Sequence, residues 1–158
     1  MAPCHNHLFQ PDNMLFDGRQ AWLVGSEAVF RNDRYAGLAA AANRIVASEA
    51  QEQLYLWEYF GAPPTERQRA RFHLMRQVAH MFYANAFLML WPAGAPMRGD
   101  GPAPSYRSLQ RRFWTGQLRL TDSRAKAVFG RAHYEQLLRN LGQTRWGQTL
   151  GALGARQP

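Results

Sequence analysis

Cysteine and lysine are almost absent from this sequence, and long uninterrupted apolar runs are missing. Cys4 is the only cysteine, which excludes an internal disulfide and makes a reducing cytoplasm the expected location. The longest apolar stretch, residues 78–91, is interrupted by His80 and Asn85 and is shorter than the roughly 20 residues that cross a bilayer. We therefore expect a cytoplasmic protein without a membrane-spanning helix. No basic segment precedes an apolar one at the N-terminus, so no secretory signal is predicted.

The sequence does contain enough apolar material for one ordinary globular domain. Of its 158 residues, 46% are hydrophobic and 19% are charged. A chain of this length and composition can bury a sizeable core and is not typical of a disordered segment. We expect a single domain that covers residues 1–158.

Positive charge is concentrated in the last third of the chain. The formal net charge is +8, yet residues 1–97 carry eight arginines against eight acidic residues, whereas residues 98–158 carry eleven Arg and Lys against three Asp and Glu. Guanidinium groups pair well with phosphate, so a basic nucleic-acid-associated protein is one alternative. No recognition motif accompanies these arginines, and a solvated basic helical face explains them more simply. We do not expect nucleic acid to be the partner.

The first third of the chain has the pattern of a β-hairpin. Residues 14–16 and 21–24 are apolar, and a turn beginning at Asp17-Gly18 separates them. Such a hairpin would display the preceding polar segment, residues 3–13, at one end.

Helices are expected after residue 34. Apolar residues recur at helical spacing within 38–45. Residues 48–51, Ser-Glu-Ala-Gln, resemble a capping box for a helix that ends at Gly61 before Pro63. The next helix should begin at Thr65, and its later part is apolar nearly all round, which predicts the central buried helix. One of its apolar stripes consists of Phe72, Met75, Ala79, Phe82 and Ala86.

The rest of the chain is predicted to be a loop followed by a basic helical segment. Residues 92–104 are rich in proline and glycine, which predicts a loop or lid. Helices are expected at 105–115 and 122–141, the latter with Phe129 and Ala132 on its inner side. The predicted fold class is mainly α, a helical bundle with a small N-terminal β-hairpin. Its predicted segments are 1–34, 35–91, 92–104 and 105–158.

Several short motifs near the N-terminus follow one another in a fixed order: a polar loop, a β-hairpin, and an acidic residue at the start of a helix. They are His5-Asn6-His7-Leu8, Pro11-Asp12-Asn13, Asp17-Gly18, Trp22-Leu23-Val24-Gly25-Ser26-Glu27 and Asn32-Asp33-Arg34-Tyr35-Ala36-Gly37-Leu38-Ala39. Kinase-type catalytic loops place an aspartate base, a downstream asparagine that binds Mg²⁺ and a second metal-binding acid in this order. The motifs resemble those of the aminoglycoside phosphotransferase and choline kinase family, which has a protein-kinase-like fold. The helical segments "RARFHLMRQVAHMFYANAFLML" and "FGRAHYEQLLRNL" also look like the C-terminal lobe of that family.

Three carboxylates of the family pattern are missing. The catalytic Asp falls on His7, two residues after His5, the metal-binding Asp falls on Gly25, and an Asp that braces the loop falls on Gly37. Mg²⁺ prefers several hard oxygen ligands, and Asn13 supplies one neutral amide oxygen. Histidine can accept a proton near neutral pH, so His7 could serve as a base. The resemblance thus implies that His5 and His7 mark the catalytic position, Asn13 the cofactor and metal position, and Gly25 the metal position.

The resemblance implies ATP-dependent phosphorylation of a small-molecule hydroxyl, with ATP and Mg²⁺ as the family's cofactors. We expect no counterpart of the nucleotide-binding N-terminal lobe, because His5 closely follows Met1 and the only lysine is Lys126 in a late helix. We expect a truncated, catalytically impaired C-terminal lobe that is inactive and binds no cofactor by itself. Asp12 and Glu27 are the nearest carboxylates that could still help to hold a metal.

A second alternative is a non-catalytic binding or regulatory module. An isolated C-terminal lobe would expose the apolar cleft face that the other lobe covers, which favours self-association or a protein partner. Cys4, His5 and His7 are weak candidates for a zinc site or a cysteine nucleophile, because such sites need more ligands or an oriented base. The remaining histidines fall in predicted helices and are expected in the core or at its rim: His73, His80 and His133.

Overall fold

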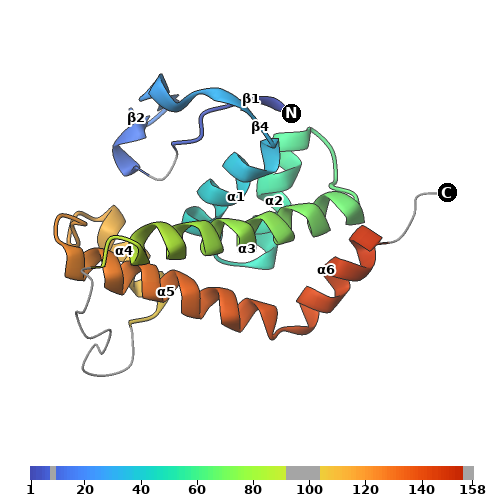
Figure 1. Cartoon of the computed structure of the whole chain (residues 1–158). Coiled ribbons are helices and arrows are strands. Elements are labelled where there is room, and N and C mark those ends of the chain that lie inside the picture. Colours follow the sequence, from blue (N-terminus) through green and yellow to red (C-terminus); the bar gives the residue numbers. More distant parts are fainter. Residues whose placement is uncertain (8–9, 92–103, 155–158) are drawn as a thin grey trace. The chain divides into compact units, whose positions relative to one another are not determined.

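A computed structural model of the protein describes residues 1–7, 10–91 and 104–154, so the predicted loop at 92–104 lies almost wholly outside the described residues. This described part is mainly α-helical with two small antiparallel sheets, which confirms the predicted fold class (Figure 1). No described helix is both long enough and apolar enough to cross a bilayer. The helices are α1 (Arg34–Ile45), α2 (Glu49–Phe60), α3 (Glu66–Leu88), α4 (Tyr106–Trp114), α5 (Ser123–Leu141) and α6 (Thr144–Gly154).

The chain divides into two compact units. The first comprises Met1–Arg76 together with Gln148–Pro158, and the second comprises Gln77–Gly147. Helices α3 and α6 each contribute residues to both units. The prediction of a single domain stays a prediction.

Both small sheets lie in the first unit. Strand β2 (Met14–Phe16) pairs with β3 (Ala21–Leu23), as the sequence predicted. The carboxylate of Asp17 stabilises the connection by accepting hydrogen bonds from the backbone N–H groups of Arg19 and Gln20, at 2.8 and 2.7 Å. The second sheet was not predicted: β1 (Ala2–Cys4) pairs with β4 (Phe30–Asn32), which joins segments almost thirty residues apart in the chain.

The predicted helix boundaries around residues 48–68 are confirmed. Ser48 caps α2, since its hydroxyl accepts a hydrogen bond from the Gln51 N–H at 3.2 Å. Gly61 ends α2 in the left-handed conformation, with φ of 68°, which glycine adopts without steric cost. Thr65 and Gln68 cap α3 reciprocally, because each side chain accepts a hydrogen bond from the backbone N–H of the other.

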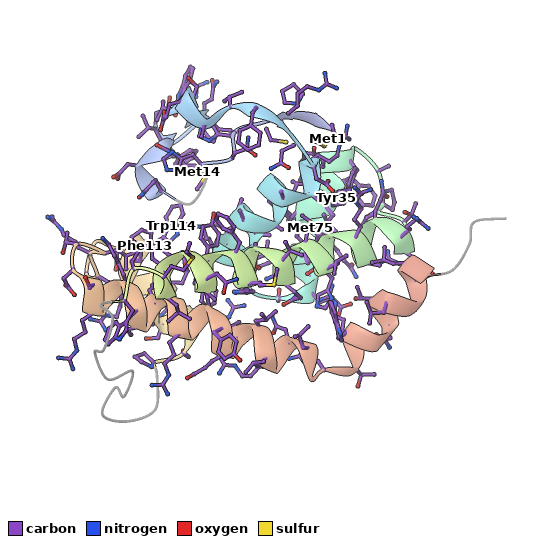
Figure 2. All side chains as sticks on the ribbon, viewed as in Figure 1. Met1, Met14, Tyr35, Met75, Phe113 and Trp114 are labelled. Carbon is purple, nitrogen blue, oxygen red and sulfur yellow. The ribbon has the colours of Figure 1, made fainter. Side chains whose placement is uncertain are left out.

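The core of the first unit is formed by α1, α2 and the start of α3. Burial of the apolar side chains on the facing sides of these helices supplies the main driving force for packing the three helices together. Met75 packs against this core and comes from α3, while Tyr35 comes from the start of α1 (Figure 2). The buried members are Tyr35, Leu38, Ala42, Val46, Leu56 and Phe72.

The later part of α3 is apolar nearly all round, as the sequence shows, but the prediction that this makes it the central buried helix is wrong for part of its surface. Met81 and Phe82 are exposed, and the buried face runs instead through Gln77, His80 and Ala84. The buried polar groups have partners on α5 that a hydrophobicity pattern does not reveal. Gln77 accepts a hydrogen bond from Asn140 at 2.7 Å, and the Nδ1 atoms of His80 and His133 lie 3.0 Å apart.

Helices α4 and α5 agree with the predicted ranges within two residues, whereas α6 was covered only by the broad prediction of a helical segment at 105–158 and was given no bounds of its own. Glycines at positions 147, 151 and 154 give α6 a low intrinsic helix propensity. Its Thr149 hydroxyl lies 2.8 Å from Nδ1 of His73. His73, like His80 and His133, is therefore a buried, hydrogen-bonded core histidine, as the sequence predicted.

Candidate functional site

The candidate site consists of residues 5–29, a stretch whose two ends are held together by the β1–β4 pair. Asn6 lies at the centre of this closure, in the left-handed conformation with φ of 57°, which asparagine tolerates better than most residues. Its Nδ2 donates to the carbonyl oxygens of Cys4 and Ala28 at 2.7 and 3.0 Å. Its Oδ1 accepts from Asn32 at 2.9 Å. Sequence reasoning missed this role, although a left-handed asparagine is a common signature of a tight loop.

His5 joins the opening loop to the end of the hairpin. Its Nε2 lies 2.6 Å from the carbonyl oxygen of Val24, and because a carbonyl can only accept, Nε2 carries the proton. Its Nδ1 is buried and has no hydrogen-bond partner within the described part of the chain. His5 therefore holds the opening loop to the backbone of Val24. Its predicted catalytic role stays a prediction.

His7 forms an ion-pair contact with Glu27, which belongs to the short 3₁₀-helix η2 (Ser26–Ala28). The distance from His7 Nδ1 to Glu27 Oε1 is 2.9 Å, and the two side chains are 39% and 64% exposed. The backbone N–H of Glu27 itself, followed by the hydrogen bond from His7, lowers the pKa of the Glu27 carboxyl. Glu27, one of the two nearest carboxylates in the sequence, is thus hydrogen-bonded to His7.

Asn13 and Gly25, the two predicted metal positions, lie side by side. Asn13 ends the 3₁₀-helix η1 (Pro11–Asn13), and its Nδ2 donates to the carbonyl oxygen of His7 at 2.8 Å. Gly25 has a φ of 73°, and a Cβ placed on it would lie 2.5 Å from Oδ1 of Asn13. The Asn13 amide therefore occupies the space in which a carboxylate side chain at position 25 would begin.

Gly37 lies within α1, where an added Cβ would meet nothing within 4 Å. No carboxylate at this position braces the loop, and the nearby anchor is Asp33, the N-cap of α1. Its side chain accepts from the Tyr35 N–H at 3.0 Å and from Arg71 at 2.6 Å. Burial raises the pKa of Asp33, but the Arg71 and Tyr35 hydrogen bonds outweigh that effect and hold the pKa below its ordinary value.

The side chains at this site do not fit a bound Mg²⁺. Mg²⁺ requires several oxygen ligands in near-octahedral geometry. Asn13 is turned onto the His7 backbone, and Glu27 accepts the proton of the His7 ring. The Cys4 thiol is directed at the carbonyl oxygens of Ala2 and Asn32. Among the residues that the structure describes, no three His, Cys, Asp or Glu side chains gather as a metal site.

Comparison with known proteins identifies the fold. The chain matches no protein-family profile and no curated protein in sequence. Its fold is similar to that of one solved structure. It is similar to the crystal structure of a choline/ethanolamine kinase family protein from Mesorhizobium loti, with a TM-score of 0.68 and 16% sequence identity. The similarity covers 96% of this chain and 42% of that chain, so this chain spans less than half the length of the protein it resembles.

Proposed function

We propose that this chain is a truncated and catalytically impaired phosphotransferase domain. The family reaction would be ATP-dependent phosphorylation of a small-molecule hydroxyl, and we expect the chain alone to be inactive in it. The observation that carries the proposal is the contact between Asn13 and Gly25. The fold brings together the two positions predicted to share a metal, and the chain has filled the space between them with an amide hydrogen-bonded to backbone.

The arrangement of Asn13 and Gly25 disfavours binding of Mg²⁺-ATP for two reasons: position 25 lacks a charge, and the Asn13 side chain obstructs it. A glycine at position 25 contributes no charge to offset a divalent cation, and phosphoryl transfer depends on metal ions that bridge and neutralise the phosphate oxygens. A carboxylate introduced at position 25 would need Asn13 to move and would hold a non-glycine residue at a positive φ.

Thermal unfolding with ATP and Mg²⁺ tests the proposal. A ligand present at about 100 times its Kd stabilises a protein by about 2.7 kcal/mol, which is readily measured. We expect the same melting temperature with and without Mg²⁺-ATP, and no phosphorylation of amino-alcohols or aminoglycosides. A magnesium-dependent rise that Asn13→Ala abolishes would overturn the proposal.

The exposed β2–β3 hairpin favours a second candidate function, a non-catalytic binding module. Leu15 and Trp22 face each other in the strand register and are both 51% exposed. A two-stranded hairpin is marginally stable by itself, and exposed apolar pairs of this kind mark protein contacts. We expect reversible self-association in sedimentation velocity, reduced by Leu15→Ser with Trp22→Ser. A concentration-independent monomer would leave the impaired phosphotransferase as the better proposal.

A further inference from the structure

We propose that one end of the second unit is a docking surface for an anionic membrane. Arginine side chains there bind lipid phosphates, and aliphatic side chains enter the headgroup layer. The inference goes beyond the proposed function and does not depend on it, because it uses no residue of the 5–29 segment. We call this surface the basic end. Its members are all exposed: Arg111, Arg112, Arg119 and Arg124, with Met89 and Leu90.

Helices α3 and α5 lie side by side within this unit and run in opposite directions. The Asn140 side chain, near the end of α5, donates to Gln77 on α3 at 2.7 Å. Later in α3, Phe87 lies so close to Gly130 that a Cβ added to the glycine would be 2.9 Å from the Phe87 Cβ. The contacts on α5 move back towards its start as those on α3 move forward. The C-terminal end of α3 therefore lies near the N-terminal end of α5.

Helix α4 lies against the same part of α5 and runs in the direction of α3. Tyr106, its first residue, packs against the His133 ring with the ring centroids 4.7 Å apart. Phe113, in its last turn, packs against Phe129 with the centroids 5.6 Å apart. The C-terminal ends of α3 and α4 and the start of α5 thus meet at one end of the second unit (Figure 1).

Hydrogen bonds fix the backbone at the end of α4. The Thr115 hydroxyl donates to the carbonyl oxygen of Arg111 at 3.0 Å. The chain then turns back, and the Leu118 N–H donates to the carbonyl oxygen of Arg112 at 2.9 Å. Both arginines therefore project from an ordered helix end.

Neighbouring acids leave the charge of the basic end largely uncompensated. Residues 104–126 contain a single acidic residue, Asp122, whose side chain accepts from the Ala125 N–H at 2.8 Å and caps α5. None of the four arginines forms an ion pair with an acidic residue in the described part of the chain. A guanidinium pairs bidentately with phosphate, and each basic residue close to an anionic membrane strengthens binding roughly fivefold. The charge of the basic end thus complements an anionic lipid surface.

Two exposed aliphatic side chains favour a membrane over a nucleic acid as the partner. Met89 is 84% exposed and Leu90 is 53% exposed, directly after α3. Their N–H groups still donate to the carbonyl oxygens of Asn85 and Phe87, at 2.9 and 3.3 Å, so both residues are held at the helix end. Such side chains are stabilised on leaving water for a bilayer interface, whereas a phosphate backbone offers them no apolar contact. Stable docking needs both the apolar and the electrostatic contribution.

Vesicle co-sedimentation of the full chain tests the charged part of the basic end. The probes are vesicles of phosphatidylcholine alone and of phosphatidylcholine with about one third phosphatidylserine. We expect binding only to the anionic vesicles, and we expect Arg111→Gln with Arg112→Gln to weaken it roughly 25-fold. Arg19→Gln with Arg34→Gln, from the first unit, is the matched control and should bind like the wild type. Equal affinities of the Arg111 and Arg112 double variant and the wild type would overturn the proposal.

The apolar part is tested by Met89→Ser with Leu90→Ser. We expect this variant to bind anionic vesicles roughly tenfold more weakly and to keep the salt dependence of the wild type, because no charge has changed. Ile45→Ser with Leu54→Ser removes two exposed aliphatic side chains from the first unit and is the control. Equal melting temperatures show that the variants are folded. Unchanged binding of the Met89 and Leu90 double variant would reduce the basic end to electrostatic attraction and would refute the docking surface.

Duplex DNA is the competitor that separates a membrane from a nucleic acid. At physiological ionic strength we expect the chain to stay on anionic vesicles, because salt does not screen the apolar contacts, and we expect DNA not to displace it. Displacement by DNA, or binding to DNA alone, would identify a nucleic-acid partner and defeat the proposal. Either result leaves the proposed function untouched, since Mg²⁺-ATP binding and phosphorylation are measured separately.

Discussion

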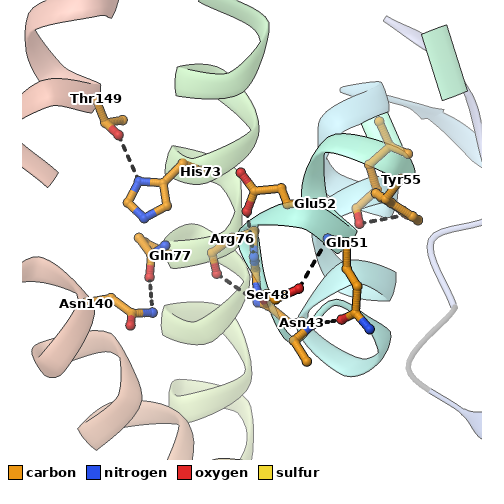
Figure 3. Close-up of polar contacts among 12 residues, drawn as sticks. Asn43, Ser48, Gln51, Glu52, Tyr55, His73, Arg76, Gln77, Asn140 and Thr149 are labelled. Carbon is orange, nitrogen blue, oxygen red and sulfur yellow. Dashed lines mark hydrogen bonds and ion pairs between the residues drawn. The ribbon is translucent and has the colours of Figure 1, made fainter. Parts of the chain in front are cut away.

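Glu52 and Arg76 form the most deeply buried ion pair among the described residues. Arg76 donates to Glu52 at 2.9 Å and to the side-chain oxygen of Asn43 at 2.8 Å, and Asn43 in turn donates to the Arg76 carbonyl (Figure 3). The Glu52 side chain is only 3% exposed. A charge this far from water is tolerated only while its partner is present, so the pair ties α1, α2 and α3 together.

Removing one partner of this pair should destabilise the protein strongly. We expect Glu52→Ala to lower the free energy of unfolding by about 3 to 5 kcal/mol, because it leaves the guanidinium of Arg76 buried without its carboxylate. Glu52→Leu combined with Arg76→Met should recover most of the loss. Urea unfolding measures these differences. Glu58→Ala, which removes an exposed carboxylate from the same helix, is the control, and an equal loss in both variants would contradict the prediction.

For single residues, the sequence shows which residue type stands at each position of the candidate site, but it does not show which side chains contact each other. The absence of a carboxylate at positions 7, 25 and 37 is visible in the sequence alone. The contact between His7 and Glu27 is not visible in the sequence, because twenty residues separate the two along the chain. Arg76 and Glu52 were likewise hidden, since a charged residue in an amphipathic helix is expected to face solvent.

At the scale of elements, Tyr55 couples α2 to α1. Its hydroxyl donates to the carbonyl oxygen of Leu38 at 3.1 Å, and its ring packs against Phe72. Burial raises the pKa of Tyr55 to about 12, because the phenolate would lose its hydration. The two helices are therefore held together by a group that must stay protonated.

This shift predicts a loss of stability in alkaline solution. The folded-state pKa lies above the value of about 10 in an unfolded chain, so the contribution of Tyr55 is complete below pH 10 and is lost as the pH rises towards 12. We expect a loss of about 2 to 3 kcal/mol over that interval. Tyr55→Phe should be less stable by about 1 kcal/mol at pH 7 but should lose less between pH 10 and 12. Tyr134→Phe removes an exposed tyrosine hydroxyl from α5 and should keep the wild-type profile. Parallel profiles for Tyr55→Phe and the wild type would rule out the assignment.

Elements specified by local signals were predicted well, and those specified by distant partners were not. The hairpin, the capping box at Ser48, the helix end at Gly61 and the helix start at Thr65 each depend on a few neighbouring residues, and each is confirmed. The β1–β4 pair depends on contacts between residues far apart in the chain. The burial of the later part of α3 depends on polar partners in the second unit, such as Asn140, so its apolar residues alone did not show which side of the helix is buried.

At the scale of the whole molecule, charge is segregated between the two units. Residues 77–147 contain ten Arg and Lys against three Asp and Glu, whereas the remaining residues are almost balanced. Glu135, one of the three acids, already pairs with Arg131 and Arg139. Asp122 caps the start of α5, where its charge also favours the helix dipole. The second unit therefore carries nearly all of the excess positive charge.

This excess should produce weak, salt-sensitive binding to nucleic acid without a specific site. Each phosphate contact adds about −0.9 to the slope of log K against log salt, so two to four contacts predict a slope of roughly −2 to −4 for duplex DNA. We expect binding at low salt that vanishes near physiological ionic strength. Exposed Arg111 and Arg112 lie at the end of α4, and replacing both with glutamine should make the slope shallower by about 2. The paired replacement of Arg19 and Arg34 in the balanced unit is the control and should change the slope little. A tight complex that persists at physiological salt and is lost with Arg111→Gln and Arg112→Gln would instead favour a nucleic-acid-binding function over the impaired phosphotransferase.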